Sequence, residues 1–152
     1  MEICPDYEDL FRTLNAFRIK YLVVGAHAVI FHTEPRYTKD IDVWIAPQVN
    51  DAERVYQALK AFGAPLRGLK ADAFKDQSLI YQMGIEPVRV DIITRIESVS
   101  FREAWKDRRR TLYGKTPIHV IGLNDLIRVK RKAGRPQDLL DLAKLTARRK
   151  RR

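Results

Sequence analysis

Residues 21–45 constrain the fold of this chain more than any other stretch of it. A continuous apolar run at residues 21–24 is typical of a buried strand, and Gly25 then marks a tight exit into a short helix. A second apolar segment carries two carboxylates, Asp40 and Asp42, with a single residue between them. Because side chains two apart in a strand point to the same face, both carboxylates are expected to converge on one spot.

Two carboxylates at that distance repel each other, so we expect a cation between them. Hard oxygen ligands one strand period apart suit Mg²⁺ or Mn²⁺, which keeps waters and phosphate oxygens as its other ligands. A further acid, Asp91, stands among the β-branched residues of a predicted strand at residues 88–93. Burying an acid among apolar neighbours is costly unless the acid is paired or bound to a metal, although Asp91 could also face the surface.

The rest of the chain mixes helical and strand patterns, which indicates an α+β fold. Residues 64–76 lack periodicity and predict a loop, and the basic cluster at residues 106–110 is expected to be exposed. We expect Leu139 and Leu142 to pack the last helix. The predicted elements are a helix from Pro5, a helix over 50–62, strands at 79–83 and 88–93, a helix over 97–105, an edge strand at 118–121, and a C-terminal pair of helices beginning near Asn124 and Pro136.

A length of 152 residues allows one domain with a real core, which we assign to residues 1–147, and a hydrophobic content of 45% argues against disorder. The formal net charge is +10, and the five basic residues of a tail at 148–152 supply half of it. A polyanion such as RNA is therefore an expected partner of the tail on electrostatic grounds.

Three absences predict a cytoplasmic protein. Cys4 has no second cysteine to pair with, which suits a reducing compartment. The N-terminus lacks the basic, apolar and small-residue succession of a signal peptide. No apolar run approaches the roughly 20 residues needed to span a bilayer, so we expect a soluble protein with no membrane partner.

The order of strand, Gly25-Ala26 turn, helix and Asp40-x-Asp42 strand resembles the nucleotidyltransferase superfamily, which has the DNA polymerase β-like fold, a mixed sheet flanked by helices. Residues 36–42, which read R-x-T-x-D-x-D, and residues 130–141 look like small bacterial AbiEii-type nucleotidyltransferases, a group that includes toxins of toxin–antitoxin pairs. The resemblance covers most of the chain. It departs from the family at Ala26, where a Ser or Gly is usual, because Ala offers only its backbone N–H to a triphosphate.

The resemblance implies metal-dependent transfer of a nucleoside monophosphate from an NTP to a hydroxyl of RNA, protein or a small molecule, with an antitoxin protein as a further partner. It also implies that Asp40, Asp42 and Asp91 hold Mg²⁺ or Mn²⁺ and carry the catalysis. The residues implied to contact the nucleotide are Gly25, Ala26, Arg36, Thr38, Lys130, Arg135 and Asp138.

Other interpretations of these residues stay open. Arg36 could be a solvated loop charge, and residues 130–138 could form a buried ion-pair corner between two helices. His27 and His32 do not share a helix face, and no Cys or third nearby His completes a zinc set, so we expect hydrogen-bonded structural roles for both. His32 could also reach a nucleotide from its place near the loop.

Three other functions compete with nucleotidyl transfer. A glycosyltransferase also uses Asp-x-Asp, but it normally needs a longer nucleotide-binding domain than the 39 residues that precede Asp40. A degenerate, non-catalytic domain that binds nucleotide or RNA agrees with the replacement at Ala26. A small basic nucleic-acid-binding protein with structural acids is the third, and no base-reading motif supports it.

Overall fold

The computed structural model describes residues 3–84 and 88–151 of the chain. The described strands form one mixed six-stranded sheet in the order β3-β4-β2-β1-β6-β5. Helices flank this sheet, so the predicted α+β class is confirmed. The elements in chain order are α1 (Pro5–Ala16), β1 (Leu22–Val24), α2 (Gly25–His32), β2 (Asp40–Trp44), α3 (Ala52–Phe62), the 3₁₀ helix η1 (Ala71–Lys75), β3 (Ile80–Met83), β4 (Arg89–Ile93), α4 (Phe101–Lys106), β5 (Arg109–Tyr113), β6 (Thr116–Val120), α5 (Leu123–Ala133) and α6 (Pro136–Lys150).

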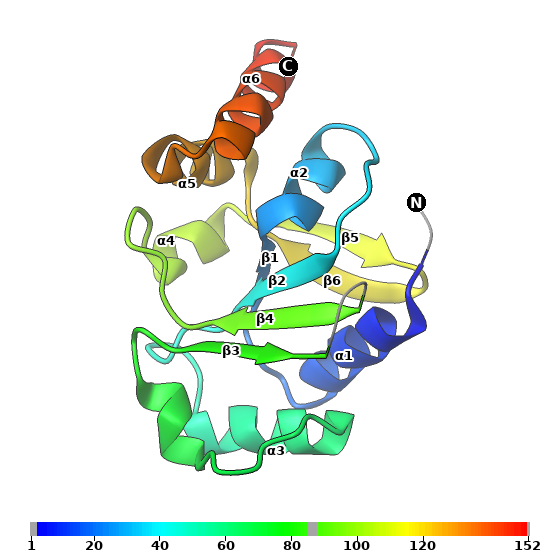
Figure 1. Ribbon diagram of the computed structural model, residues 1–152, viewed down its shortest axis with the longest axis vertical. Helices are drawn as coiled ribbons and strands as arrows, with labels where there is room; N and C mark the ends of the chain where they lie inside the picture. Colours follow the sequence, from blue (N-terminus) through cyan, green and yellow to red (C-terminus); the bar gives the residue numbers. More distant parts are fainter. Residues whose placement is uncertain (1–2, 85–87, 152) are drawn as a thin grey trace.

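The helices divide between the two faces of the sheet (Figure 1). Helices α1 and α3 contact each other below the sheet in this view, and α2, α5 and α6 contact one another above it. Helix α4 lies on the upper side, beyond the end of β2 to which Trp44 belongs, and its Phe101 meets the Trp44 ring edge to face at 5.0 Å. Helices α2, α4, α5 and α6 therefore surround the upper face of the sheet at β2.

The apolar run at residues 21–24 forms the centre of the sheet, as its composition predicts. All three residues of β1 are buried, because helices lie over both of its faces. Strand β1 is antiparallel to β2, with Val24 opposite Asp42, and parallel to β6. This register brings the turn at Gly25 beside the Asp-x-Asp segment.

The helix α3 follows the stop and start signals of its sequence. Asp51 caps it by accepting a hydrogen bond from the backbone N–H of Glu53 at 2.9 Å, and Gly63 ends it in the left-handed conformation with φ of 98°. We predicted a loop over residues 64–76, but this segment contains η1, whose Phe74 is buried in the core.

The C-terminal pair of helices is confirmed, with α5 ending at Gly134 and α6 starting at Pro136. The prediction for Leu139 is wrong: its side chain is 55% exposed, whereas Leu145 is fully buried and Leu142 packs against the core. Helix α6 runs on to Lys150, so most of the basic segment continues the helix.

The basic cluster at residues 106–110 is exposed, as predicted, except for the half-buried Arg108, but its end forms a strand, β5, that the sequence analysis did not predict. The prediction of an edge strand at residues 118–121 is wrong. Strand β6 lies between β1 and β5 and is not an edge strand. Strand β5 takes the edge position, where Arg109 and Arg110 point their charges to solvent.

None of the helices in the described part of the chain combines the length and apolarity needed to cross a membrane.

Candidate active site

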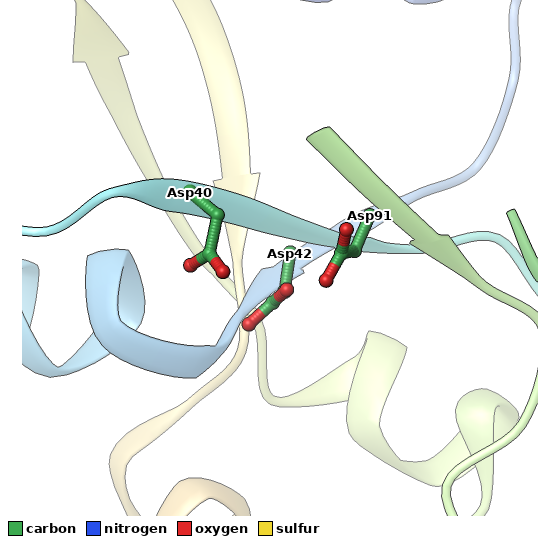
Figure 2. A group of neighbouring side chains, drawn as sticks. All are labelled: Asp40, Asp42 and Asp91. Atoms are coloured by element: carbon green, nitrogen blue, oxygen red, sulfur yellow. The ribbon is translucent and has the colours of Figure 1, made fainter. Parts of the chain in front are cut away.

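Three carboxylates meet on the face of the sheet that α2 covers (Figure 2). Strands β2 and β4 are parallel neighbours with Asp42 opposite Asp91, and Asp40 lies two residues before Asp42 on the same face. One carboxylate oxygen from each residue lies within 4.8 Å of the others. Asp91 is only 8% exposed, so it does not face the surface. The structure thus brings together all three acids that the sequence analysis singled out.

The turn at Gly25 fits closely against Asp42. Gly25 has φ of 66°, and a Cβ atom at this position would collide with a carboxylate oxygen of Asp42. Glycine is therefore required by both the backbone conformation and the space. Helix α2 starts at Gly25, so its first turn, whose backbone N–H groups have no partner within the helix, begins beside Asp42. A helix N-terminus favours a negatively charged ligand such as a phosphate.

The electrostatics of the cluster favour a bound cation. Burial raises the pKa of Asp42 to about 7, and repulsion from Asp40 and Asp91 adds to this effect, while Lys130 and Arg89 oppose it. The donor set is three carboxylates, which are hard oxygen ligands of the kind that Mg²⁺ and Mn²⁺ take. These residues therefore fit a divalent cation.

Arg89 is a member of the site that the sequence analysis missed. Its Nε and Nη2 donate to the two carboxylate oxygens of Asp91 at 3.1 and 3.0 Å, and Nη2 also lies 3.2 Å from Asp40 Oδ2. Such forked contacts are the strong form of an Arg–carboxylate pair. The signal was available in the sequence, since Arg89 precedes Asp91 by one strand period and so shares its face.

A second charged cluster lies where α5 meets α6. Lys130 is buried, and its Nζ lies 3.1 Å from Asp138 Oδ1 and 3.2 Å from Asp141 Oδ2. Arg135 Nε lies 2.7 Å from Asp138 Oδ2, and Arg36 Nη1 reaches from the α2–β2 loop to within 2.9 Å of Asp141 Oδ1. Burial acts to raise the pKa of Asp138, but hydrogen bonds from Arg135 and Lys130 lower it to about 2. The predicted ion-pair corner therefore exists, and it includes Asp141, which was not among the predicted site residues.

The ion-pair corner faces the three carboxylates. Lys130 opposes the rise in the pKa of Asp42, and the pKa of Arg135 is raised mainly by its hydrogen bond to Asp138, with a smaller contribution from the charge of Asp42. Thr38, another residue implied by the resemblance, donates its hydroxyl to the backbone carbonyl of Asp40 at 3.3 Å. All residues predicted to contact the nucleotide thus gather around the carboxylates or the corner beside them.

The two histidines differ from each other. The Nε2 atom of His32 lies 2.7 Å from the Ile121 carbonyl oxygen, and the residue is buried, so its predicted structural role is confirmed. The hydrogen bond predicted for His27 is not found among the described residues, where its ring instead meets the rings of Tyr7 and Tyr113 edge to face at 5.7 and 6.5 Å. His27 lines a hollow of about 530 Å³ together with Tyr7 and Thr38.

Comparisons with known proteins agree with this geometry. Residues 2–148 match the family described as "Nucleotidyltransferase of unknown function (DUF6036)". No curated protein sequence matches the chain.

Solved structures share the fold at low sequence identity. The candidate nucleotidyltransferase TM1012 of Thermotoga maritima superposes with a TM-score of 0.59 at 19% identity, over 96% of each chain. The lincosamide antibiotic adenylyltransferase LnuA, bound to lincomycin, gives a TM-score of 0.57 at 15% identity, over 96% of this chain and 98% of LnuA. An antigenic nucleotidyltransferase-like protein from Paracoccidioides brasiliensis superposes with a TM-score of 0.57 at 18% identity, over 91% of this chain and 72% of the Paracoccidioides chain.

The nucleotidyltransferase resemblance drawn from the turn and the Asp-x-Asp segment is therefore confirmed, while the narrower likeness to AbiEii-type enzymes stays a prediction. Since the match extends over nearly the whole length, from the first helix through the charged corner, the chain belongs to the DUF6036 family of nucleotidyltransferases.

Proposed function

We propose that the chain transfers a nucleoside monophosphate from an NTP to an acceptor hydroxyl, with Mg²⁺ or Mn²⁺ held by Asp40, Asp42 and Asp91. The single observation that carries the proposal is the convergence of these three carboxylates on one face of the sheet. Burial, and then repulsion among the three acids, raises the pKa of Asp42, and a divalent cation bound there would offset both effects.

The triphosphate has its own set of partners in this proposal. The backbone N–H groups at the start of α2, at Gly25 and Ala26, would contact its phosphate oxygens. Arg135, whose side chain is 76% exposed, lies at the corner beside Asp42 and would add a guanidinium. Lys130 is tied to two buried acids, so its contribution would be positive charge at short range.

The residues near the loop would orient the nucleotide. Arg36 is fixed by Asp141 at 2.9 Å, which holds the α2–β2 loop against α6. Asp138 is paired with both Lys130 and Arg135, so we assign it the role of keeping these cations in position. Thr38 would support Asp40 through its hydrogen bond to the Asp40 backbone.

The reaction would be an in-line displacement at the α-phosphorus. The acceptor oxygen forms a bond to phosphorus while the bond to pyrophosphate breaks. Bound divalent cations would neutralise the triphosphate and lower the pKa of the attacking hydroxyl. The residues of the chain would hold the reacting groups in line, which is the main source of rate enhancement in phosphoryl transfer.

The acceptor that the charge distribution favours is RNA. The basic residues at the end of α6 and its exposed Lys144 offer cations to phosphates, and Arg135 extends this basic surface to the carboxylate site. An RNA acceptor agrees with the AbiEii-type resemblance and with a toxin paired with an antitoxin. A small-molecule acceptor is the alternative, since LnuA, which shares the fold, is an antibiotic adenylyltransferase.

Labelled transfer tests the proposal. The protein is incubated with each α-labelled NTP, Mg²⁺ or Mn²⁺, and either total RNA or total protein, with EDTA as the control. We expect label in the RNA fraction, lost with EDTA and with Asp42→Asn. Metal-dependent NTP binding without any labelled product would instead support a degenerate nucleotide-binding domain, the second candidate function, which Ala26 favours.

A further inference from the structure

A hollow of about 530 Å³ adjoins the carboxylate site, and its volume lies within the range of small-molecule sites. Tyr7, at the start of α1, lines it and donates its hydroxyl to the backbone carbonyl of Arg89 at 3.1 Å. Thr38, on the other wall, donates to the backbone carbonyl of Asp40. The two walls are therefore attached to the residues that begin β2 and β4, which carry the acids.

The walls of the hollow are aromatic and almost neutral. Four of the lining residues carry rings with polar atoms, namely Tyr7, His27, Tyr37 and Tyr113, and most of the others are aliphatic. None of the described lining residues is acidic, and the one that is charged, Arg36, is committed to Asp141. Such walls attract a flat, uncharged ring more than they attract phosphate.

His27 gives the hollow a hydrogen-bonding edge. Burial lowers its pKa to about 4, so the ring is neutral at pH 7 and has one donor and one acceptor nitrogen. Neither nitrogen bonds to another described residue. A ligand with both donors and acceptors on a planar ring would satisfy them.

The phosphate contacts lie elsewhere. The triphosphate partners proposed above are the start of α2 and the corner at Arg135, and neither Gly25 nor Arg135 lines the hollow. A nucleotide with its α-phosphate at the carboxylates needs one place for its anionic end and another for its neutral end. The hollow beside Asp40 meets the second need.

We propose that this hollow binds the nucleobase of the NTP, with Tyr37 stacking on the ring and His27 hydrogen-bonding its edge. This inference rests on the proposed function, because it assumes that an NTP reacts at the carboxylates. Tyr37 is suited to stacking because it is 75% exposed and lies in the α2–β2 loop, where a ring can be covered from the solvent side. The hollow would therefore recognise the base, while the triphosphate is bound by other residues.

Calorimetric titration of the full chain in Mg²⁺ tests the proposal with ATP, CTP, GTP, UTP and inorganic triphosphate as separate probes. We expect at least one NTP to bind more tightly than triphosphate. Tyr37→Ala and His27→Ala should each weaken the binding of that NTP by at least about fivefold, which is the lower end of the effect of removing a stacking ring and within the effect of losing one hydrogen bond. Neither variant should change the affinity for triphosphate. Tyr56→Ala, on α3, which contributes no residue to the hollow, is the control and should change neither affinity.

The outcomes separate this inference from the proposed function. Unchanged NTP affinity in both variants overturns the nucleobase site, as does equal binding of NTP and triphosphate to the wild type. If Tyr37→Ala, which alters an exposed side chain, raises only the KM for the acceptor, the hollow binds the acceptor and the proposal is also overturned. If neither NTP nor triphosphate binds the wild type, the proposed function itself fails.

Discussion

Replacing Asp42 with asparagine should stabilise the metal-free protein at neutral and alkaline pH. The pKa of Asp42 is about 7 in the folded protein, against an ordinary value of 3.8. The folded chain therefore keeps a proton that the unfolded chain loses between about pH 4 and pH 7. Because the folded state binds more protons in this interval, the free energy of unfolding falls as pH rises through it and stays low above it.

The size of the effect follows from the same pKa. At ~1.36 kcal/mol per pH unit, the difference from 3.8 corresponds to about 4 kcal/mol lost by the wild type above pH 7. Asparagine cannot ionise, so Asp42→Asn avoids this loss. For a chain of this size, ~3 °C per kcal/mol converts the difference to about 12 °C in Tm.

Thermal unfolding at pH 4 and pH 8, followed by circular dichroism, measures this difference in Tm. In EDTA we expect Asp42→Asn to melt above the wild type at pH 8 and close to it at pH 4. Mg²⁺ should raise the Tm of the wild type at pH 8 and raise that of the variant much less. Asp72→Asn, which removes an exposed carboxylate on η1, is the matched control and should not change the pH profile. A variant that melts below the wild type at pH 8 in EDTA would refute the reasoning.

Three other predictions concern charged residues outside the three carboxylates. Arg89→Gln should tighten Mn²⁺ binding by at least about tenfold, or ~1.4 kcal/mol, because the Arg89 guanidinium competes with the metal for Asp40 and Asp91. Titration calorimetry measures the Mn²⁺ affinity, and Arg12→Gln, on the exposed face of α1, is the control. Unchanged Mn²⁺ affinity would show that Arg89 does not compete. Lys130→Met should lower the free energy of unfolding, measured by urea titration, by about 3 kcal/mol, because it leaves the buried Asp138 without one of its partners. A loss below ~1 kcal/mol would contradict the stabilising role of the ion-pair corner. Deleting residues 148–152 should flatten the log–log salt dependence of RNA binding by at most about 3.5, at ~0.7 per charge, and an unaltered slope would exclude the tail from the RNA interface.

The carboxylate site could be predicted because its signals are local. Strand periodicity places Asp40 and Asp42 on one face, and a lone acid among β-branched residues indicates that Asp91 is held by a specific partner. The pairing of β2 with β4 in the register that sets Asp42 opposite Asp91 is not local. It depends on how the whole sheet assembles, and the sequence analysis could only supply it through the family resemblance.

The errors have a common physical origin in elements whose environment is set by distant neighbours. Arg109 and Arg110 look like a solvated cluster, but an edge strand can expose successive charges and still pair on one side, as β5 does with β6. Leu139 has a helical spacing that suits packing, yet its side of α6 stays exposed, while other residues of the helix contact α5 and α2. The contact of Arg36 with Asp141 joins residues 105 positions apart, which no local pattern indicates.

The most direct test of the account compares transfer with binding in Asp91→Asn. For the wild type and the variant, we compare the single-turnover rate of transfer from the α-labelled NTP that the screen identifies with the affinity for a non-hydrolysable form of the same NTP. Calorimetry in Mg²⁺ measures this affinity. The account predicts nearly intact binding, because Asp40 and Asp42 remain, and a transfer rate at least about a hundredfold lower, because an interaction made mainly in the transition state is lost. Equal transfer rates in the wild type and Asp91→Asn would contradict the claim that these three carboxylates form the catalytic centre.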